Sequence, residues 1–107
     1  MILNITINER PIGIDVPEEV VADADDFFAR MDGDMNRGWQ MGRDYVENPT
    51  DIQRCQIAAD KLFTALHTGN KNLMMLMAAY ILAKFPDTHR VDIDTTGNMQ
   101  QTRLHFS

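Results

Sequence analysis

The chain of 107 residues predicts a single α+β domain, residues 1–107, with about four helices between an N-terminal and a C-terminal β-hairpin. Apolar residues alternate with polar ones at both ends of the chain, and they recur at helical spacing between the ends. Hydrophobic residues make up 44% of the chain, which is enough for one core. Because an isolated hairpin is only marginally stable, we expect both hairpins to pair into one antiparallel sheet covered by helices. A helical bundle with loose terminal arms is the alternative.

The N-terminal hairpin is predicted from residues that alternate with a period of two on either side of a polar turn at 8–11. Its inward positions are Leu3, Ile5, Ile7, Ile12, Ile14 and Val16. The first helix should begin at about Pro17, whose fixed φ suits a first helical turn, and should end near Asp32-Gly33. Between Asp15 and Asp34 eight acids stand against one base, so this segment carries −7 in a chain of net charge −6.

Residues 32–36, DGDMN, resemble the start of a calcium loop. Asp32, Asp34 and Asn36 supply oxygen atoms at loop positions 1, 3 and 5. The glycine, however, falls one position late at Gly38, and Arg43 stands where the strong bidentate glutamate belongs. The pattern therefore favours an Asp-Gly turn between two helices, and we predict no metal site.

A second helix is predicted over residues 34–47, although Gly38 and Gly42 weaken it. Its candidate binding residues combine guanidinium groups with aromatic or thioether side chains, and they are Arg37, Trp39, Met41, Arg43 and Tyr45. On a helix Trp39 and Arg43 are four residues apart and can stack. A core role for Trp39 is the alternative interpretation.

The third helix is predicted to start after Thr50, because Thr50 and Gln53 match a capping box, and to end at Gly69. The fourth, residues 70–84, is apolar nearly all round and ends before Pro86. Such a helix is either central in its own chain or covered by another. We therefore expect a homodimer with Met74, Met77 and Ile81 at the contact, and a purely internal core helix is the alternative. A second hairpin is expected from residues 90–94 and 102–106.

Reactive groups are sparse. The three histidines, His67, His89 and His105, are far apart and lack metal-ligand spacing. The lone cysteine, Cys55, lies on the apolar stripe of the third helix and is predicted to be a buried, inert thiol. We predict no catalytic residue and no cofactor, and we favour a protein that is not an enzyme.

The charge distribution and the single cysteine limit the kinds of partner and the compartment that we expect. The acidic segment opposes binding to nucleic acid, whereas Glu19, Asp23 and Asp26 could dock a basic protein. The longest apolar run is too short to span a membrane, and a single cysteine suits a reducing, cytoplasmic compartment. We expect a small cytosolic accessory or adaptor protein that acts through protein contacts. The alternative is a small-molecule-binding or enzymatic domain with a pocket near Trp39, Arg43 and Tyr45.

Overall fold

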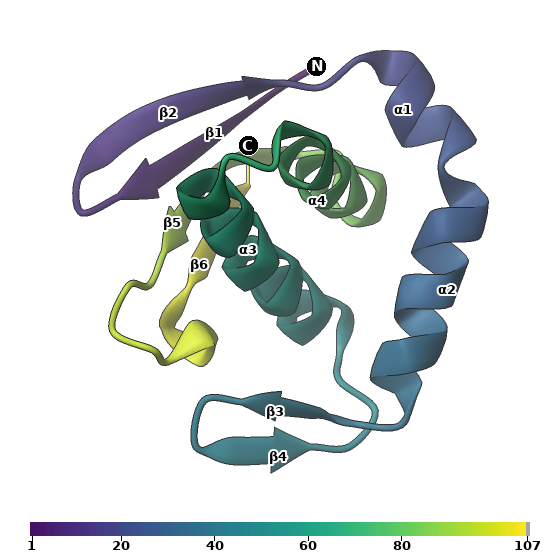
Figure 1. The fold of residues 1–107 in the computed structure, drawn as a ribbon, viewed down its shortest axis with the longest axis vertical. Coiled ribbons are helices and arrows are strands. Elements are labelled where there is room, and N and C mark those ends of the chain that lie inside the picture. The colour runs from purple at the N-terminus through teal and green to yellow at the C-terminus, as the bar shows by residue number, and fades with distance from the viewer. Residues whose placement is uncertain (107) are drawn as a thin grey trace.

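A computed structural model describes residues 1–106 and has the predicted α+β fold (Figure 1). The elements in chain order are β1 (Ile2–Ile7), β2 (Arg10–Asp15), α1 (Glu18–Asp23), α2 (Asp25–Asn36), β3 (Trp39–Met41), β4 (Asp44–Val46), α3 (Asp51–Thr68), α4 (Lys71–Lys84), β5 (Thr88–Ile93), a 3-10 turn η1 (Met99–Gln101) and β6 (Arg103–Phe106).

The two terminal hairpins lie in one four-stranded sheet of order β2-β1-β5-β6, as the sequence predicts. Each hairpin is antiparallel internally, but β5 runs parallel to β1, with Ile5 opposite Val91. The sheet is therefore mixed, and the prediction of a wholly antiparallel sheet is wrong in this pairing. On β2, Pro11 lacks an N–H group for a further ladder, which fits the position of β2 at the edge and of β1 in the centre.

One face of the sheet carries the core. Leu3 and Ile5 of β1 and Val91 of β5 are fully buried, whereas Ile2 and Asn4 on the opposite face of β1 are exposed. Helices α3 and α4 pack side by side against the buried face, and the pair formed by α1 and α2 runs along the side of α3 and α4 that is remote from β5 and β6 (Figure 1). The α1–α2 pair and the β6 edge thus lie on opposite sides of the central helices.

The central helices have the predicted boundaries. The Thr50 hydroxyl accepts the Gln53 N–H at 3.2 Å, and the Gln53 carbonyl oxygen accepts the Thr50 N–H at 2.9 Å, so the capping box is confirmed. Gly69 caps the end of α3, and the Asn70 side chain caps the start of α4. The second half of α4, residues 77–82, is buried within its own chain.

The prediction of a helix over residues 34–47 is wrong. Helix α2 continues through DGDMN to Asn36, so this segment is the last turn of α2 and not a turn between helices. The next residues form the hairpin of β3 and β4, with Gln40 opposite Tyr45. Gly38 and Gly42 have φ values of 112° and 67°, which a right-handed helix excludes.

The first predicted helix is divided in two. The chain leaves helical geometry at Ala24, whose φ and ψ are −92° and 22°. Helix α1 buries no residue, whereas α2 buries Phe28, Met31 and Met35 against the core. The short α1 lies against α4 with Val20 and Val21 only partly buried, and the longer α2 supplies the buried side chains.

Two glycine substitutions test this description of residues 33–38. Gly33 lies inside α2 with open space around its Cα, so Gly33→Ala should raise the free energy of unfolding by about 0.5 to 1 kcal/mol. At Gly38 an added Cβ would lie 2.5 Å from the Tyr45 hydroxyl oxygen, so Gly38→Ala should lower it by about 2 kcal/mol. Urea denaturation measures both. Destabilisation by Gly33→Ala would contradict the helical assignment of DGDMN.

Candidate functional site

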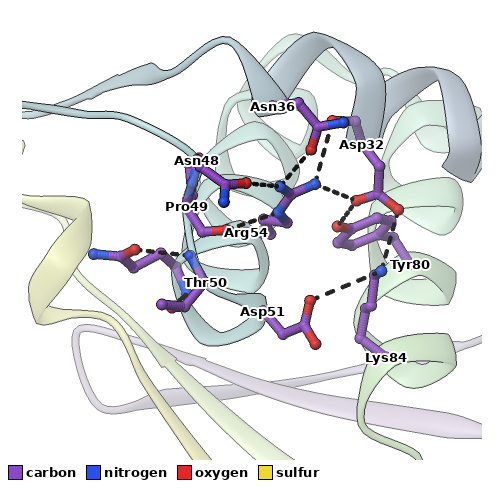
Figure 2. A network of polar contacts seen from close by, with 10 residues as sticks. Asp32, Asn36, Asn48, Pro49, Thr50, Asp51, Arg54, Tyr80 and Lys84 are labelled. Atoms are coloured by element: carbon purple, nitrogen blue, oxygen red, sulfur yellow. Dashed lines mark hydrogen bonds and ion pairs between the residues drawn. The ribbon is translucent and has the colours of Figure 1, made fainter.

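The most extensive polar cluster among residues 1–106 is centred on Arg54, in the first turns of α3 (Figure 2). The residue is 7% exposed, and its guanidinium group donates five hydrogen bonds. The acceptors are the carbonyl oxygens of Pro49 and Asp32 and the side-chain oxygens of Asp32, Asn36 and Asn48, at 2.6 to 3.2 Å. A guanidinium group has five N–H donors, so its hydrogen-bonding capacity is fully used.

The carboxylate of Asp32 joins this cluster to α4. Its Oδ1 accepts hydrogen bonds from Arg54 at 3.1 Å and from the buried Tyr80 hydroxyl at 2.6 Å, and its Oδ2 accepts one from Lys84 at 3.1 Å. Lys84 also lies 3.9 Å from the exposed carboxylate of Asp51. The last turn of α2, the loop before α3, α3 itself and α4 therefore meet at one charge network, which we call the Arg54 network.

Partial burial alone would raise the pKa of Asp32, but the hydrogen bonds from Tyr80, Lys84 and Arg54 outweigh it and hold this pKa below 3.8. Burial, together with the hydrogen bond to Asp32, raises the pKa of the Tyr80 hydroxyl. Asp32 thus stays ionised and Tyr80 stays protonated at neutral pH. Because these two pKa values lie far on either side of neutral pH, the pair keeps a stable hydrogen bond and is poorly suited to proton transfer. The geometry of this cluster therefore supports a structural role.

Cys55, next to Arg54 on α3, is buried as predicted. Burial in the apolar core and the negative charge of Asp51 raise the pKa of its thiol to about 12. The thiolate needed for nucleophilic attack is therefore scarce at neutral pH.

Metal ligation has little support at DGDMN. The side-chain oxygens of Asp32 and Asn36, two of the three calcium-like positions, are engaged by Arg54. Within residues 1–106 no three acidic, histidine or cysteine side chains are grouped so that they could hold a metal ion.

The predicted binding residues of 37–45 do not form one cluster. Trp39 lies on β3, where the Lys61 ammonium sits 4.8 Å from the centre of its ring. The Tyr45 hydroxyl donates to the Arg37 carbonyl oxygen at 3.0 Å, and Met41 is fully buried. Arg43, at the tip of the hairpin, lines a separate cleft with residues 96–98. The stacking of Trp39 on Arg43 was expected on a helix, and the hairpin removes the basis for that expectation.

The predicted partner residues also lie in different environments, some exposed and some buried. Glu19, Asp23 and Asp26 are exposed along α1 and α2. On α4, Met74 is half-buried, but Met77 and Ile81 are only 1% and 0% exposed in a single chain. Their own chain covers them, so in this conformation they belong to the core and offer no surface to a second copy.

The histidines remain apart from one another, but one of them gains a carboxylate partner. His105 Nε2 lies 2.8 Å from Asp92 Oδ2 on the solvent face of the sheet, and Arg90 contacts the same carboxylate. Partial burial opposes the effect, yet these two partners lower the pKa of Asp92. The pair ties β5 to β6 on the open face of the sheet.

Sequence reasoning missed the Arg54 network because its contacts join residues that are 22 and 48 positions apart. The hydrophobic stripe gave no signal for Arg54, because neighbouring residues on a helix are about 100° apart and Arg54 lies beside the stripe that contains Cys55. Residues 54–59 are all buried, so the structure covers this part of α3 on every side.

In comparisons with known proteins, the chain matches no family model, no curated protein and no solved structure. No helix among the described residues has the length and continuous apolar character that crossing a membrane requires. The function must therefore be inferred from the surfaces and clusters of this chain.

Acidification tests the role of Asp32. Because its pKa is lowered in the folded state, its contribution to stability is complete above pH values near 3.8 and is lost as the pH falls through the folded pKa. Asp32→Asn should therefore lower the free energy of unfolding at pH 7, and its difference from the wild type should shrink steadily below about pH 4. Urea denaturation between pH 7 and pH 2 measures this difference.

The matched control is Asp87→Asn, an exposed acid that makes no side-chain hydrogen bond or ion pair with residues 1–106. It should follow the wild-type curve at each pH. A difference between Asp32→Asn and the wild type that stays constant down to pH 2 would show that the ionised form of Asp32 does not stabilise the Arg54 network.

Proposed function

We propose that this chain is a small accessory or adaptor protein that acts through protein contacts and binds a basic partner segment along α1 and α2. The observation that carries the proposal is the state of the eight acids between Asp15 and Asp34. Seven of them are exposed, and none of these seven forms an ion pair with another described residue. These seven are Asp15, Glu18, Glu19, Asp23, Asp25, Asp26 and Asp34.

The eighth acid differs from the other seven. Asp32 is compensated by Arg54 and Lys84 at 3.1 Å each, so the charge that the fold requires is already paired internally. The seven exposed acids have no such ion-pair partner, and although four of them complement the helix dipoles in the first turns of α1 and α2, their mutual repulsion opposes the compact state. A partner rich in arginine or lysine would relieve that repulsion and could form bidentate bonds with the carboxylates.

The shape of the α1–α2 surface suits such a partner. Glu19 and Asp23 are four residues apart on α1 and so share a face of it, and the exposed Asp26 follows in the first turn of α2. Figure 1 shows both helices at the side of the molecule, where no other element covers them. An extended or helical basic segment could therefore approach along their whole length.

A small-molecule-binding role is the second candidate. A groove between α2, α3 and α4 is lined by the apolar side chains of Phe27, Met31 and Leu73. Lys61, whose ammonium group lies over the Trp39 ring, also lines this groove. Its lining has two bases, Arg30 and Lys61, and one acid, Asp34, so this groove could accept a small apolar anion. Its volume of about 210 Å³ is below the roughly 300 to 1,000 Å³ of ordinary ligand pockets, so we rank it second.

Charge reversal tests the proposed function. The tagged protein is recovered from its native cells with its bound proteins, and a Glu19→Lys/Asp23→Lys variant is compared with the wild type. Removing two complementary contacts should reduce the recovered basic partner by about tenfold, and added salt should weaken the wild-type complex as it screens the exposed charges. Circular dichroism verifies that both proteins are folded.

The control is Glu47→Lys/Asp87→Lys, which makes the same change in net charge at two exposed acids outside α1 and α2. It should retain the partner. Equal losses in the two double variants would show a general charge effect, and recovery that is insensitive to Glu19→Lys/Asp23→Lys would remove the α1–α2 surface from the proposed function.

A further inference from the structure

Strand β6 forms an open edge of the sheet. It pairs with β5 on one side only, and every second residue of a strand directs its N–H and C=O groups toward the other side. A groove of about 660 Å³ runs along this open side, between residues 100–105 and the side chains of Ile52 and Gln56 on α3. The backbone of β6 is therefore accessible to a further strand.

The lining of this groove is mainly polar, with Ile52 and Leu104 as its apolar members, and a further exposed apolar residue, Phe106, ends β6. Ile52 is 39% exposed and Phe106 is 46% exposed, and both are among the few large hydrophobic side chains at the surface. Leu104 is half-buried opposite the core residue Val91, and the Phe106 ring lies 5.3 Å from the ring of Phe85. The apolar layer between the sheet and the helices thus continues to the β6 edge and ends there uncovered.

The two edges of the sheet differ. Strand β2 carries Pro11, which has no N–H group and so discourages the addition of a strand. Strand β6 contains no proline and ends in an apolar residue, Phe106. Of the two edges, β6 is the one equipped to accept a partner strand.

We propose that the occupant is a second copy of this chain, whose β6 pairs antiparallel with the first across a two-fold axis. The two four-stranded sheets then form one continuous eight-stranded sheet. Side chains that lie opposite each other in such a pair must share a face of the sheet. Centring the pair on Leu104 meets this condition and sets residues 103–105 of the two copies opposite one another. Thr102 stays outside the pair, because its N–H group is bonded to Met99 and its carbonyl oxygen to Gln56.

The charge distribution favours this interface. The segment of −7 lies on the far side of α3 and α4 from β6 (Figure 1), and the molecule extends about 30 Å in each direction. A dimer joined at β6 holds the two acidic surfaces at opposite ends, well beyond the screening length of about 8 Å at physiological ionic strength. A dimer joined near α1 or α2 would bring them together. The inference goes beyond the proposed function, because it concerns a different surface of the chain.

Sedimentation equilibrium between 1 and 100 μM tests the interface, with Ile52→Glu as the disrupting variant. A glutamate there lies in the first turn of α3, where it complements the helix dipole and preserves the fold, yet it replaces one of the two apolar residues of the groove by a charge in each copy. The wild type should sediment at twice its chain mass of 12.2 kDa. Ile52→Glu should sediment as a monomer, with a dissociation constant raised by at least about 100-fold.

The matched control is Ile2→Glu, the same substitution at a side chain that is 62% exposed on the solvent face of β1. It should remain dimeric. A wild type that stays monomeric up to 100 μM, or a dimer that Ile52→Glu leaves intact, would overturn the proposal. Equal disruption by Ile2→Glu would also overturn it.

A disulfide provides an independent readout of the register. In the pairing centred on Leu104, the two Cβ atoms at this position lie roughly 5 Å apart, within reach of a disulfide after small adjustment. Leu104→Cys should therefore give a covalent dimer on mild oxidation, whereas Tyr45→Cys, at an exposed site on β4, should stay largely monomeric. The native Cys55 is buried and serves as the internal background. Equal cross-linking of the two variants would contradict the register.

Discussion

The ion pair between Arg54 and Asp32 is the interaction on which the arrangement of the helices depends. A guanidinium group that is 7% exposed must have its charge and its five donors compensated, and here every acceptor comes from outside α3. Those acceptors fix the end of α2 and the loop that leads into α3. Through Asp32 the same charge reaches Tyr80 and Lys84, so α4 is held by the same network.

This network explains how a weak helix keeps its place. Helix α2 contains Gly33 near its end and has no basic residue in its last turn to complement the dipole. Its side-chain packing comes from Phe28, Met31 and Met35, and its last turn is held by the bonds of Asp32 and Asn36 to Arg54. Of the eight acids between Asp15 and Asp34, only Asp32 takes part in this network, and the other seven are exposed.

The predictions succeeded where the determining contacts are local. The capping box of Thr50 and Gln53 spans three residues, and the alternation in β1 and β2 reflects one buried face, so both can be read from the sequence. The prediction for residues 37–47 was wrong because the apolar spacing suggested a helix. The left-handed backbone conformations of Gly38 and Gly42 instead allow the hairpin.

The remaining features depend on contacts between distant parts of the chain. The parallel pairing of β1 with β5 joins strands that are separated by four helices, and no local pattern distinguishes it from an antiparallel pairing. Among the candidate site residues, Glu19, Asp23 and Asp26 were placed correctly on an exposed face, because helical amphipathicity reports exposure. Met77 and Ile81 were expected at the surface of the chain but are buried within it. The sequence of an all-apolar helix does not reveal whether its own chain or another chain covers it.

The most direct test of the central role of Arg54 is the free energy of unfolding of Arg54→Lys, measured by urea denaturation at pH 7. Lysine keeps the positive charge but cannot reproduce the planar fork that bonds five acceptors. Because it loses bonds to the buried Pro49 carbonyl oxygen and to the partly buried oxygens of Asp32, this variant should lose about 3 kcal/mol relative to the wild type. Arg30→Lys, at an exposed position of α2, should stay within about 0.5 kcal/mol of the wild type. A loss at Arg54→Lys no larger than that of Arg30→Lys would contradict the account.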